Sequence, residues 1–244
     1  MIDTQLHLLD PRCPFAPGGY RPAAHEMGDL ATLLAMMEAN AITHGVLVQP
    51  SAYGTDNTAL LDALAAHPDR FRAVVMTDDP ARAAAPGVKG VRLNLTDYAP
   101  HASGALEMAR RVLGEGLILQ VQAAPMDLAR LLGAAPDGPV VIDHMGRPDS
   151  AADGRALAAL AARPQTWLKV SGGFRLPGGW PQPSPWLADL AASFGPDGLL
   201  WGSDWPFLNT PRRPTTADTV AWGAALTDMA AATVTARRLF GFPP

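Results

Sequence analysis

The 244-residue sequence is almost without cysteine, since Cys13 is its only one. A single thiol cannot form an internal disulfide, and scarce cysteine is typical of a reducing compartment. We interpret Cys13 as a packing or loop residue rather than a nucleophile. The opening Met1-Ile2-Asp3 has neither the basic region nor the apolar core of a signal peptide, so the sequence predicts a cytoplasmic protein.

Long apolar runs and basic clusters are also missing. No apolar run approaches the roughly 18 residues that a membrane-spanning helix needs. The net charge is −4, and the arginines form scattered pairs rather than the basic patch of a nucleic-acid-binding protein. Neither GxGxxG after the first expected strand nor GxxxxGK[ST] is present, which argues against a nucleotide-binding fold. The expected partner is a small molecule rather than a nucleic acid or a membrane, and a homo-oligomer stays open.

What the sequence does contain is a regular alternation of two patterns. Short apolar, β-branched runs recur between segments of helical period, at residues 2–7, 45–49, 71–77, 88–94, 117–122, 139–144, 167–171 and 199–203. Nearly continuous hydrophobicity is typical of parallel strands that are covered on both sides. Eight such units in 244 residues predict an α/β fold, a single TIM (β/α)₈-barrel domain over residues 1–244.

The segments between these runs predict helices. One is expected to start after Asp29, a favourable N-cap residue, and the last is expected to end at Gly241. Another apolar stripe stops at His67-Pro68, because the residue before proline disfavours helix. Residues 78–87 are too few for a full helix, so we expect one shortened βα unit between the third and fourth strands.

Polar side chains end most of the expected strands, where barrel enzymes carry their catalytic groups. Fold stability does not require polar residues at one end of so many strands, whereas an active site does. These residues, in strand order, are Gln5 and His7, Gln49 and Ser51, Arg92 and Asn94, Gln120 and Gln122, His144 and Arg147, Lys169 with Ser171 and Arg175, and Asp204.

Three of these segments resemble the amidohydrolase superfamily. Asp3-Thr4-Gln5-Leu6-His7 resembles its DxHxH opening. The segments at 143–148 (DHMGRP) and 202–206 (GSDWP) resemble the sixth- and eighth-strand signatures of its lactone-hydrolase branch, which includes 2-pyrone-4,6-dicarboxylate lactonase and fuconolactonase-like enzymes. The resemblance extends over nearly the whole chain.

The resemblance implies a hydrolase that opens a small anionic lactone. Asp204 would be the general base, while His7, His144 and Gln5 would polarise the lactone carbonyl. The arginines Arg92, Arg147 and Arg175 would bind substrate carboxylates, because a guanidinium fork matches a carboxylate. Ser51, Asn94 and Gln122 complete the expected substrate-binding set. The family's further arginine after the fourth strand has no counterpart here, where the chain reads Asp97-Tyr98.

The first histidine of the superfamily's metal-binding pair is Gln5 in this chain. An amide oxygen is a poor zinc ligand, so we expect no required cofactor. A single weakly held Zn²⁺ or Mn²⁺ on His7, His144 and Asp204 stays open. Two alternatives also remain: a metal-dependent decarboxylase or amidohydrolase on the same barrel, and a binding protein for lactone acids that has lost turnover.

Overall fold

The computed structural model describes residues 1–96, 104–210 and 213–243. Its centre is one eight-stranded sheet in which the strands follow chain order and neighbouring strands are parallel. The strands are β1 (Ile2–Leu6), β2 (His44–Val48), β3 (Phe71–Val75), β4 (Val88–Asn94), β5 (Ile118–Gln122), β6 (Val140–Ile142), β7 (Thr166–Val170) and β8 (Leu199–Trp201). This confirms the predicted TIM barrel, and every strand overlaps its predicted run.

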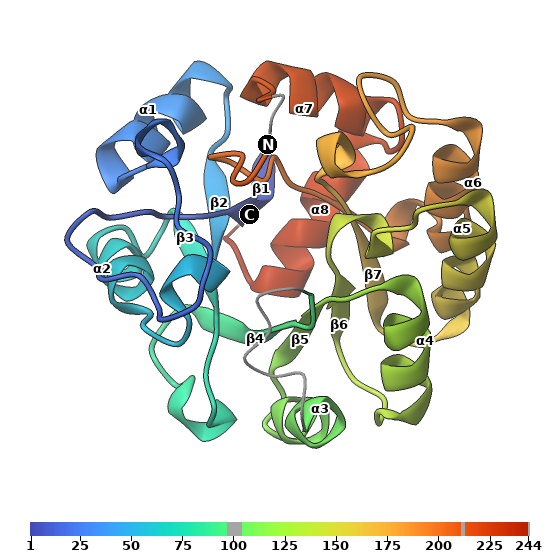
Figure 1. Ribbon diagram of the computed structural model, residues 1–244, viewed down its shortest axis with the longest axis horizontal. Coiled ribbons are helices and arrows are strands. Elements are labelled where there is room, and N and C mark those ends of the chain that lie inside the picture. The colour runs from blue at the N-terminus through green and yellow to red at the C-terminus, as the bar shows by residue number, and fades with distance from the viewer. Residues whose placement is uncertain (97–103, 211–212, 244) are drawn as a thin grey trace.

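The helices lie in a ring outside the strands (Figure 1). They are α1 (Leu30–Ala39), α2 (Thr58–Ala66), α3 (Ala105–Gly114), α4 (Pro125–Ala134), α5 (Ala151–Ala158), α6 (Pro185–Phe194), α7 (Thr216–Ala224) and α8 (Met229–Phe240). The Asp29 carboxylate caps α1 by accepting from the Thr32 amide at 2.9 Å. Gly241 ends α8 in the left-handed conformation, with φ 67°. Between β3 and β4 lies the one-turn 3₁₀ helix Pro80–Arg82, and no described helix is long and apolar enough to cross a membrane.

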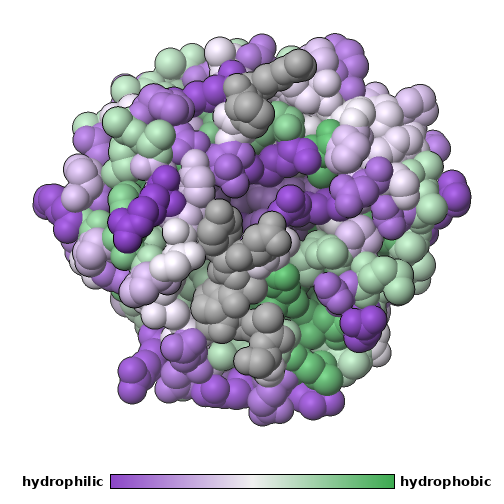
Figure 2. Space-filling view, viewed as in Figure 1, coloured by the Kyte–Doolittle hydropathy of each residue, from purple (hydrophilic) through white to green (hydrophobic). Residues whose placement is uncertain are grey.

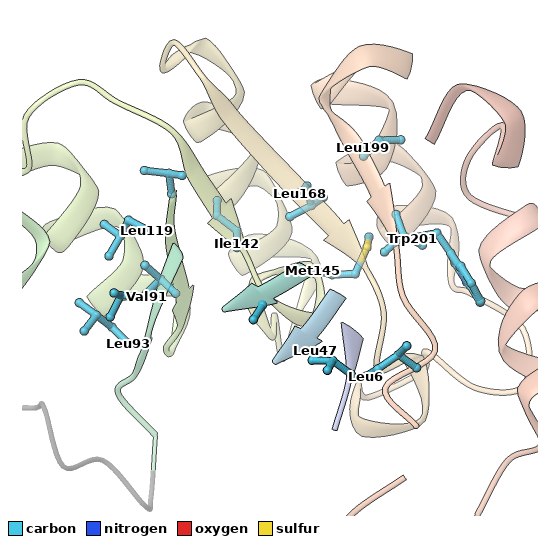
Figure 3. Packing of buried hydrophobic residues seen from close by; sticks show 14 of the residues in the cluster. Leu6, Leu47, Val91, Leu93, Leu119, Ile142, Met145, Leu168, Leu199 and Trp201 are labelled. Carbon is cyan, nitrogen blue, oxygen red and sulfur yellow. The ribbon is translucent and has the colours of Figure 1, made fainter. Parts of the chain in front are cut away.

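The alternation of side chains along each strand separates two apolar clusters. Leu47, Val91 and Leu168 point outward into the layer between strands and helices (Figure 3). Val46, Val74 and Val141 belong to a second cluster, which Phe240 at the end of α8 joins. Because this second cluster forms from side chains of several barrel strands, the inside of the barrel is packed at one end.

β1 and β8 close the barrel through a small number of specific contacts. Leu6 bridges to Trp205, and the Asp204 amide donates to the Gln5 carbonyl at 3.0 Å. Asp3 Oδ1 accepts from the Ser203 amide, also at 3.0 Å. A Cβ at Gly202 would lie 2.5 Å from the Gln5 Cβ, so only glycine permits this approach. Closure therefore brings the polar end of β1 beside Asp204.

Candidate active site

A cavity of about 360 Å³ opens at the carboxyl ends of the strands. Such a volume accommodates a small-molecule ligand. In Figure 2 hydrophilic side chains surround a hollow near the middle of this face. The predicted site residues that line the cavity are His7, Ser51, Arg92, Asn94, Gln122, His144, Arg147, Arg175 and Asp204. One pocket thus brings together residues from β4 and β5 and from the segments that follow β1, β2, β6, β7 and β8.

Asp204 is the centre of this cluster. Its Oδ1 lies 3.3 Å from His7 Nε2 and 4.0 Å from His144 Nε2. Its Oδ2 accepts from Arg175 Nε at 2.8 Å. Arg175 also donates to the Leu208 carbonyl at 2.7 Å, so this guanidinium is held in place. One carboxylate oxygen is therefore occupied by an arginine, and the other faces two imidazoles.

The electrostatic surroundings set the charge of Asp204 and His144 at neutral pH. Burial alone would raise the pKa of Asp204, but the Arg175 guanidinium, the largest opposing influence, holds that pKa well below its usual range. Burial lowers the pKa of His144 to about 4, although Asp204 and Asp143 oppose this. Asp204 is consequently an anion and His144 a neutral imidazole at pH 7.

Strained backbone presents these groups to the cavity. His144, Arg147 and Asp204 have φ values of 50°, 49° and 66°, in the left-handed region that side chains other than glycine seldom adopt. Such residues cost of order 1–3 kcal/mol each and cluster at functional sites. Gly172 has φ 64°, and a Cβ there would lie 2.7 Å from His144 Nδ1. The glycine-rich turn after β7 thus makes room for the His144 ring, whose Nδ1 lies 3.0 Å from Ser171 Oγ.

The three predicted arginines differ in how far they are already paired. Arg92 is 3% exposed, and its Nε donates to Asp143 Oδ2 at 3.1 Å. It also donates to the Gln49 carbonyl and to Gln122 Oε1. Arg147 makes no ion pair or side-chain hydrogen bond with a described residue. Arg147 therefore has its whole guanidinium available to a ligand, whereas Arg92 and Arg175 each have part of theirs occupied.

Neutral polar groups form another part of the wall. Asn94 Nδ2 donates to Ser51 Oγ at 2.6 Å, and Gln122 Nε2 donates to Thr96 Oγ1 at 3.3 Å. These hydrogen bonds fix the amides of Asn94 and Gln122. The wall thus presents oriented hydroxyl and amide groups rather than further charge.

Gln5 differs from expectation, because its amide is not among the groups that line the cavity. Its Oε1 accepts from Lys169 Nζ at 2.6 Å and from Gln120 Nε2 at 3.1 Å. Its Nε2 lies 3.4 Å from His7 Nε2. Gln5 therefore contacts the site through His7 and does not itself line the cavity, where the sequence led us to expect it.

His7 is also oriented differently from a carbonyl donor. Its Nδ1 lies 2.7 Å from the Val48 carbonyl oxygen, which can only accept. In the neutral ring the hydrogen is consequently on Nδ1, and Nε2 is an acceptor facing Asp204. The His144 ring lies further from Asp204, with its Nε2 4.0 Å from Oδ1.

Several lining residues were not identified from the sequence. Tyr20, Thr96, Phe174, Asn209 and Thr210 belong to the cavity wall. Most of them lie in loops, where no apolar periodicity marks a position, so only the fold brings them to the site. The positions Asp97 and Tyr98, where a family arginine has no counterpart, lie outside the described residues.

The barrel and its cavity are those of a (β/α)₈-barrel enzyme, with a carboxylate, two imidazoles and three arginines at the strand ends. The amidohydrolase family model matches residues 2–242, so the chain belongs to that family. It is 33% identical to the 4-sulfomuconolactone hydrolase of Rhizobium radiobacter over 241 residues, which are 88% of this chain and 80% of that protein. It is 29% identical to the 2-pyrone-4,6-dicarboxylate hydrolase of Comamonas testosteroni over 240 residues, 85% of this chain and 77% of that one.

Solved structures support the same family. A probable 2-pyrone-4,6-dicarboxylic acid hydrolase of Acinetobacter baumannii, with citric acid bound, superposes with a TM-score of 0.81 at 26% identity over 99% of each chain. A zinc-bound amidohydrolase of Burkholderia multivorans (22% identity, TM-score 0.71) and a 2,6-dihydroxybenzoate decarboxylase (17%, 0.61), each matched over 98–99% of both chains, share the fold alone. The chain is thus less similar to the decarboxylase than to the 2-pyrone-4,6-dicarboxylic acid hydrolase.

The residues present do not fit a tightly held zinc ion. The available donors are His7 Nε2, His144 Nε2 and Asp204 Oδ1, while Gln5 turns its NH₂ group toward the site. Zinc favours imidazole nitrogen, thiolate and carboxylate ligands. The NH₂ group of an amide is not a zinc ligand, so Gln5 adds no fourth donor. Within the described ranges no group of three or more His, Cys, Asp or Glu is placed to hold a metal ion. Arg175, bonded to Asp204, adds a positive charge that would oppose a cation.

Proposed function

We propose that this chain hydrolyses a small anionic lactone, with Asp204 as the general base and no required metal. The observation that supports this best is that the two oxygens of the Asp204 carboxylate have different neighbours. Oδ2 accepts a hydrogen bond from Arg175, while Oδ1 faces His7 and His144. The family's curated relatives named above hydrolyse lactones, which supports the same reaction class.

In the proposed reaction a water molecule donates hydrogen bonds to Asp204 Oδ1 and to His7 Nε2. Its oxygen attacks the lactone carbonyl carbon while Asp204 takes the proton. A low pKa makes Asp204 a weak base, so the reaction depends on a water held close to Asp204 Oδ1 and the neighbouring His7 Nε2. Collapse of the tetrahedral intermediate breaks the ring C–O bond, and the proton returns from Asp204 to the departing oxygen. The product is a hydroxy acid, or, from an enol lactone, an enol acid and its keto tautomer.

His144 stabilises the charge that develops on the carbonyl oxygen. Its pKa of about 4 keeps the ring neutral. If Ser171 donates to Nδ1, the hydrogen of the imidazole is on Nε2 and points into the cavity. A preorganised donor of this kind contributes about 3–4 kcal/mol to transition-state stabilisation.

The anionic group of the substrate binds Arg147, with Arg92 and Arg175 adding their remaining N–H groups. Ser51, Asn94 and Gln122 bind the ring oxygens and any hydroxyl groups. Among the described lining residues three arginines face one aspartate, so this part of the wall favours an anion.

The test is a panel of lactone acids, including 2-pyrone-4,6-dicarboxylate, assayed beside their methyl esters. We expect ring opening of at least one acid, with a kcat/KM at least about tenfold above its ester, since loss of one charge-assisted pair costs about 1.5–3 kcal/mol. Arg147→Met should remove most of that preference. Thermal stabilisation by the acids without any ring opening would instead indicate a binding protein.

A further inference from the structure

Lys169 is a buried cation that the proposed reaction does not use. It lies on β7, is fully buried, and its Nζ is 3.1 Å from Asp143 Oδ1. Burying an ammonium group is costly unless it is paired and hydrogen-bonded. A hydrogen bond of 2.6 Å to Gln5 Oε1 adds to this ion pair. Lys169 is thus the point where β1, β7 and the end of β6 meet.

The contacts of Lys169 fix the orientation of the Gln5 amide. An ammonium group has only donors, so the Gln5 atom beside it must be the oxygen. Gln120 supports this, because its Nε2 contacts both Gln5 Oε1 and the Asp143 carboxylate, and a carboxylate can only accept. The two donors that meet Oε1 leave the Gln5 NH₂ group facing His7.

The orientation of Gln5 in turn constrains His7. The Gln5 NH₂ group, 3.4 Å from His7 Nε2, donates toward that nitrogen. The Val48 carbonyl accepts from the opposite nitrogen, Nδ1, at 2.7 Å. Both neighbours therefore favour the same tautomer, with hydrogen on Nδ1 and a lone pair on Nε2 beside Asp204.

We propose that Lys169 is a positioning residue which, by holding the Gln5 amide, keeps His7 Nε2 an acceptor in the active site. This inference rests on the proposed function for its catalytic meaning, because the accepting Nε2 orients the attacking water. It also explains why glutamine stands in the first position of the strand-one pair: its oxygen binds the lysine and its nitrogen binds the histidine.

The direct test is ¹⁵N-histidine NMR of the whole protein, which reports which ring nitrogen carries hydrogen. The His7 signals are identified by their loss in His7→Asn. We expect hydrogen on Nδ1 in the unaltered protein and a shift toward Nε2 or a mixture in Lys169→Met, where the Gln5 amide is free to turn. The chain has one other lysine, Lys89, and Lys89→Met is the matched control that should leave the His7 signals unchanged.

Gln5→Met is a second variant that keeps the test possible if Lys169→Met does not fold. It removes the Gln5 amide and leaves the Lys169–Asp143 ion pair intact. Both variants should lower kcat by about tenfold or more, because a misplaced water loses part of the rate enhancement that the general base provides. KM should change by less than about threefold. The double variant should be no slower than the slower single one, because Lys169 acts through Gln5.

Hydrogen on Nε2 in the unaltered protein would overturn the inference. So would unchanged His7 signals in both variants. The NMR result needs no substrate, so failure of the lactone assay with the expected tautomers would reject the proposed reaction and leave the positioning role standing.

Discussion

At the scale of single residues, the account depends most on Asp204. Asp204→Asn keeps the size of the side chain and removes the proton acceptor at Oδ1. We expect kcat to fall by about 10² or more, since a general base contributes at least that much. Binding of a lactone acid should persist, because Arg147 does not contact Asp204 through any described bond. Steady-state kinetics and ligand titration measure the two quantities.

A matched control is Asp189→Asn on the exposed face of α6, which should leave kcat unchanged. Turnover within about twofold of normal in Asp204→Asn would remove this carboxylate from the reaction.

The lowered pKa of His144 predicts that the stability of the protein depends on pH. Its pKa is about 4 in the folded protein, below the usual value of 6.5, so the unfolded chain binds more protons between these pH values. The free energy of unfolding should therefore fall as pH decreases from about 6.5 to about 4, by roughly 3 kcal/mol from this residue. Asp3 opposes this, because burial raises its pKa to about 7 and its contribution to stability falls as pH rises through that value.

Comparing the unaltered protein with His144→Asn separates the contribution of this histidine to the pH dependence of the unfolding free energy from the contributions of other groups. Denaturant unfolding at pH 7 and pH 4.5 should show a smaller loss of stability in the variant than in the unaltered protein. Equal losses would mean that His144 is not held neutral by burial.

Residue types at strand ends predicted many of the polar side chains that line the cavity, but not their partners. Arg92 and Arg175 were expected to face substrate, and each is partly occupied by an aspartate, Asp143 or Asp204. Gln5 was expected at the carbonyl and instead contacts Lys169 and His7. These pairings depend on distances across the barrel, which no local pattern contains.

At the scale of elements, Glu26 joins two loops that form one wall of the cavity. Its carboxylate accepts from Tyr20 Oη at 2.5 Å and from the Ala23 amide at 2.8 Å in the loop before α1. It also accepts from the Asn209 amide at 2.6 Å in the loop after β8. Tyr20 and Asn209 both line the cavity, so Glu26 holds the two loops in register.

Glu26→Gln should loosen this wall, because an amide NH₂ cannot accept two of these hydrogen bonds. Hydrogen bonds to a charged group are worth about 1.5–3 kcal/mol. We expect a lower melting temperature, a KM raised by about fivefold or more, and a kcat changed by less than about twofold. A raised KM with a nearly unchanged kcat indicates that the variant has lost substrate binding that is equally strong in the ground state and the transition state. Glu38→Gln at the exposed end of α1 is the control, and a fall in kcat alone would contradict this role.

The elements were the most predictable part of the chain, because apolar runs and their boundaries are local. The cap of α1 at Asp29 and the end of α8 at Gly241 follow from side-chain and backbone preferences. The register shift of β1 between Asp3 and Leu6 was not predicted. It depends on closure against β8, where Asp3 accepts from the Ser203 amide.

At the scale of the whole molecule, the charge of the cavity is opposite to that of the chain. The net charge is −4, whereas the lining residues include three arginines and one aspartate. Local positive potential attracts anions, and salt screens it with a Debye length of about 10 Å at 0.1 M. We expect kcat/KM for a lactone acid to fall as ionic strength rises, while that of its methyl ester stays nearly constant. A similar salt dependence for both would contradict attraction by the cavity.

The measurement that tests the central proposal most directly is ring opening of an anionic lactone by protein dialysed against a chelator. Ring opening is followed by ¹H NMR, and bound metal is counted per chain in the same sample. Retained turnover with well under one metal ion per chain is the expected result, since a lactone carbonyl flanked by His144 and Asp204 does not require a Lewis acid. Loss of turnover on chelation, with recovery on adding Zn²⁺ or Mn²⁺, would contradict the proposal and favour a metal-dependent hydrolase.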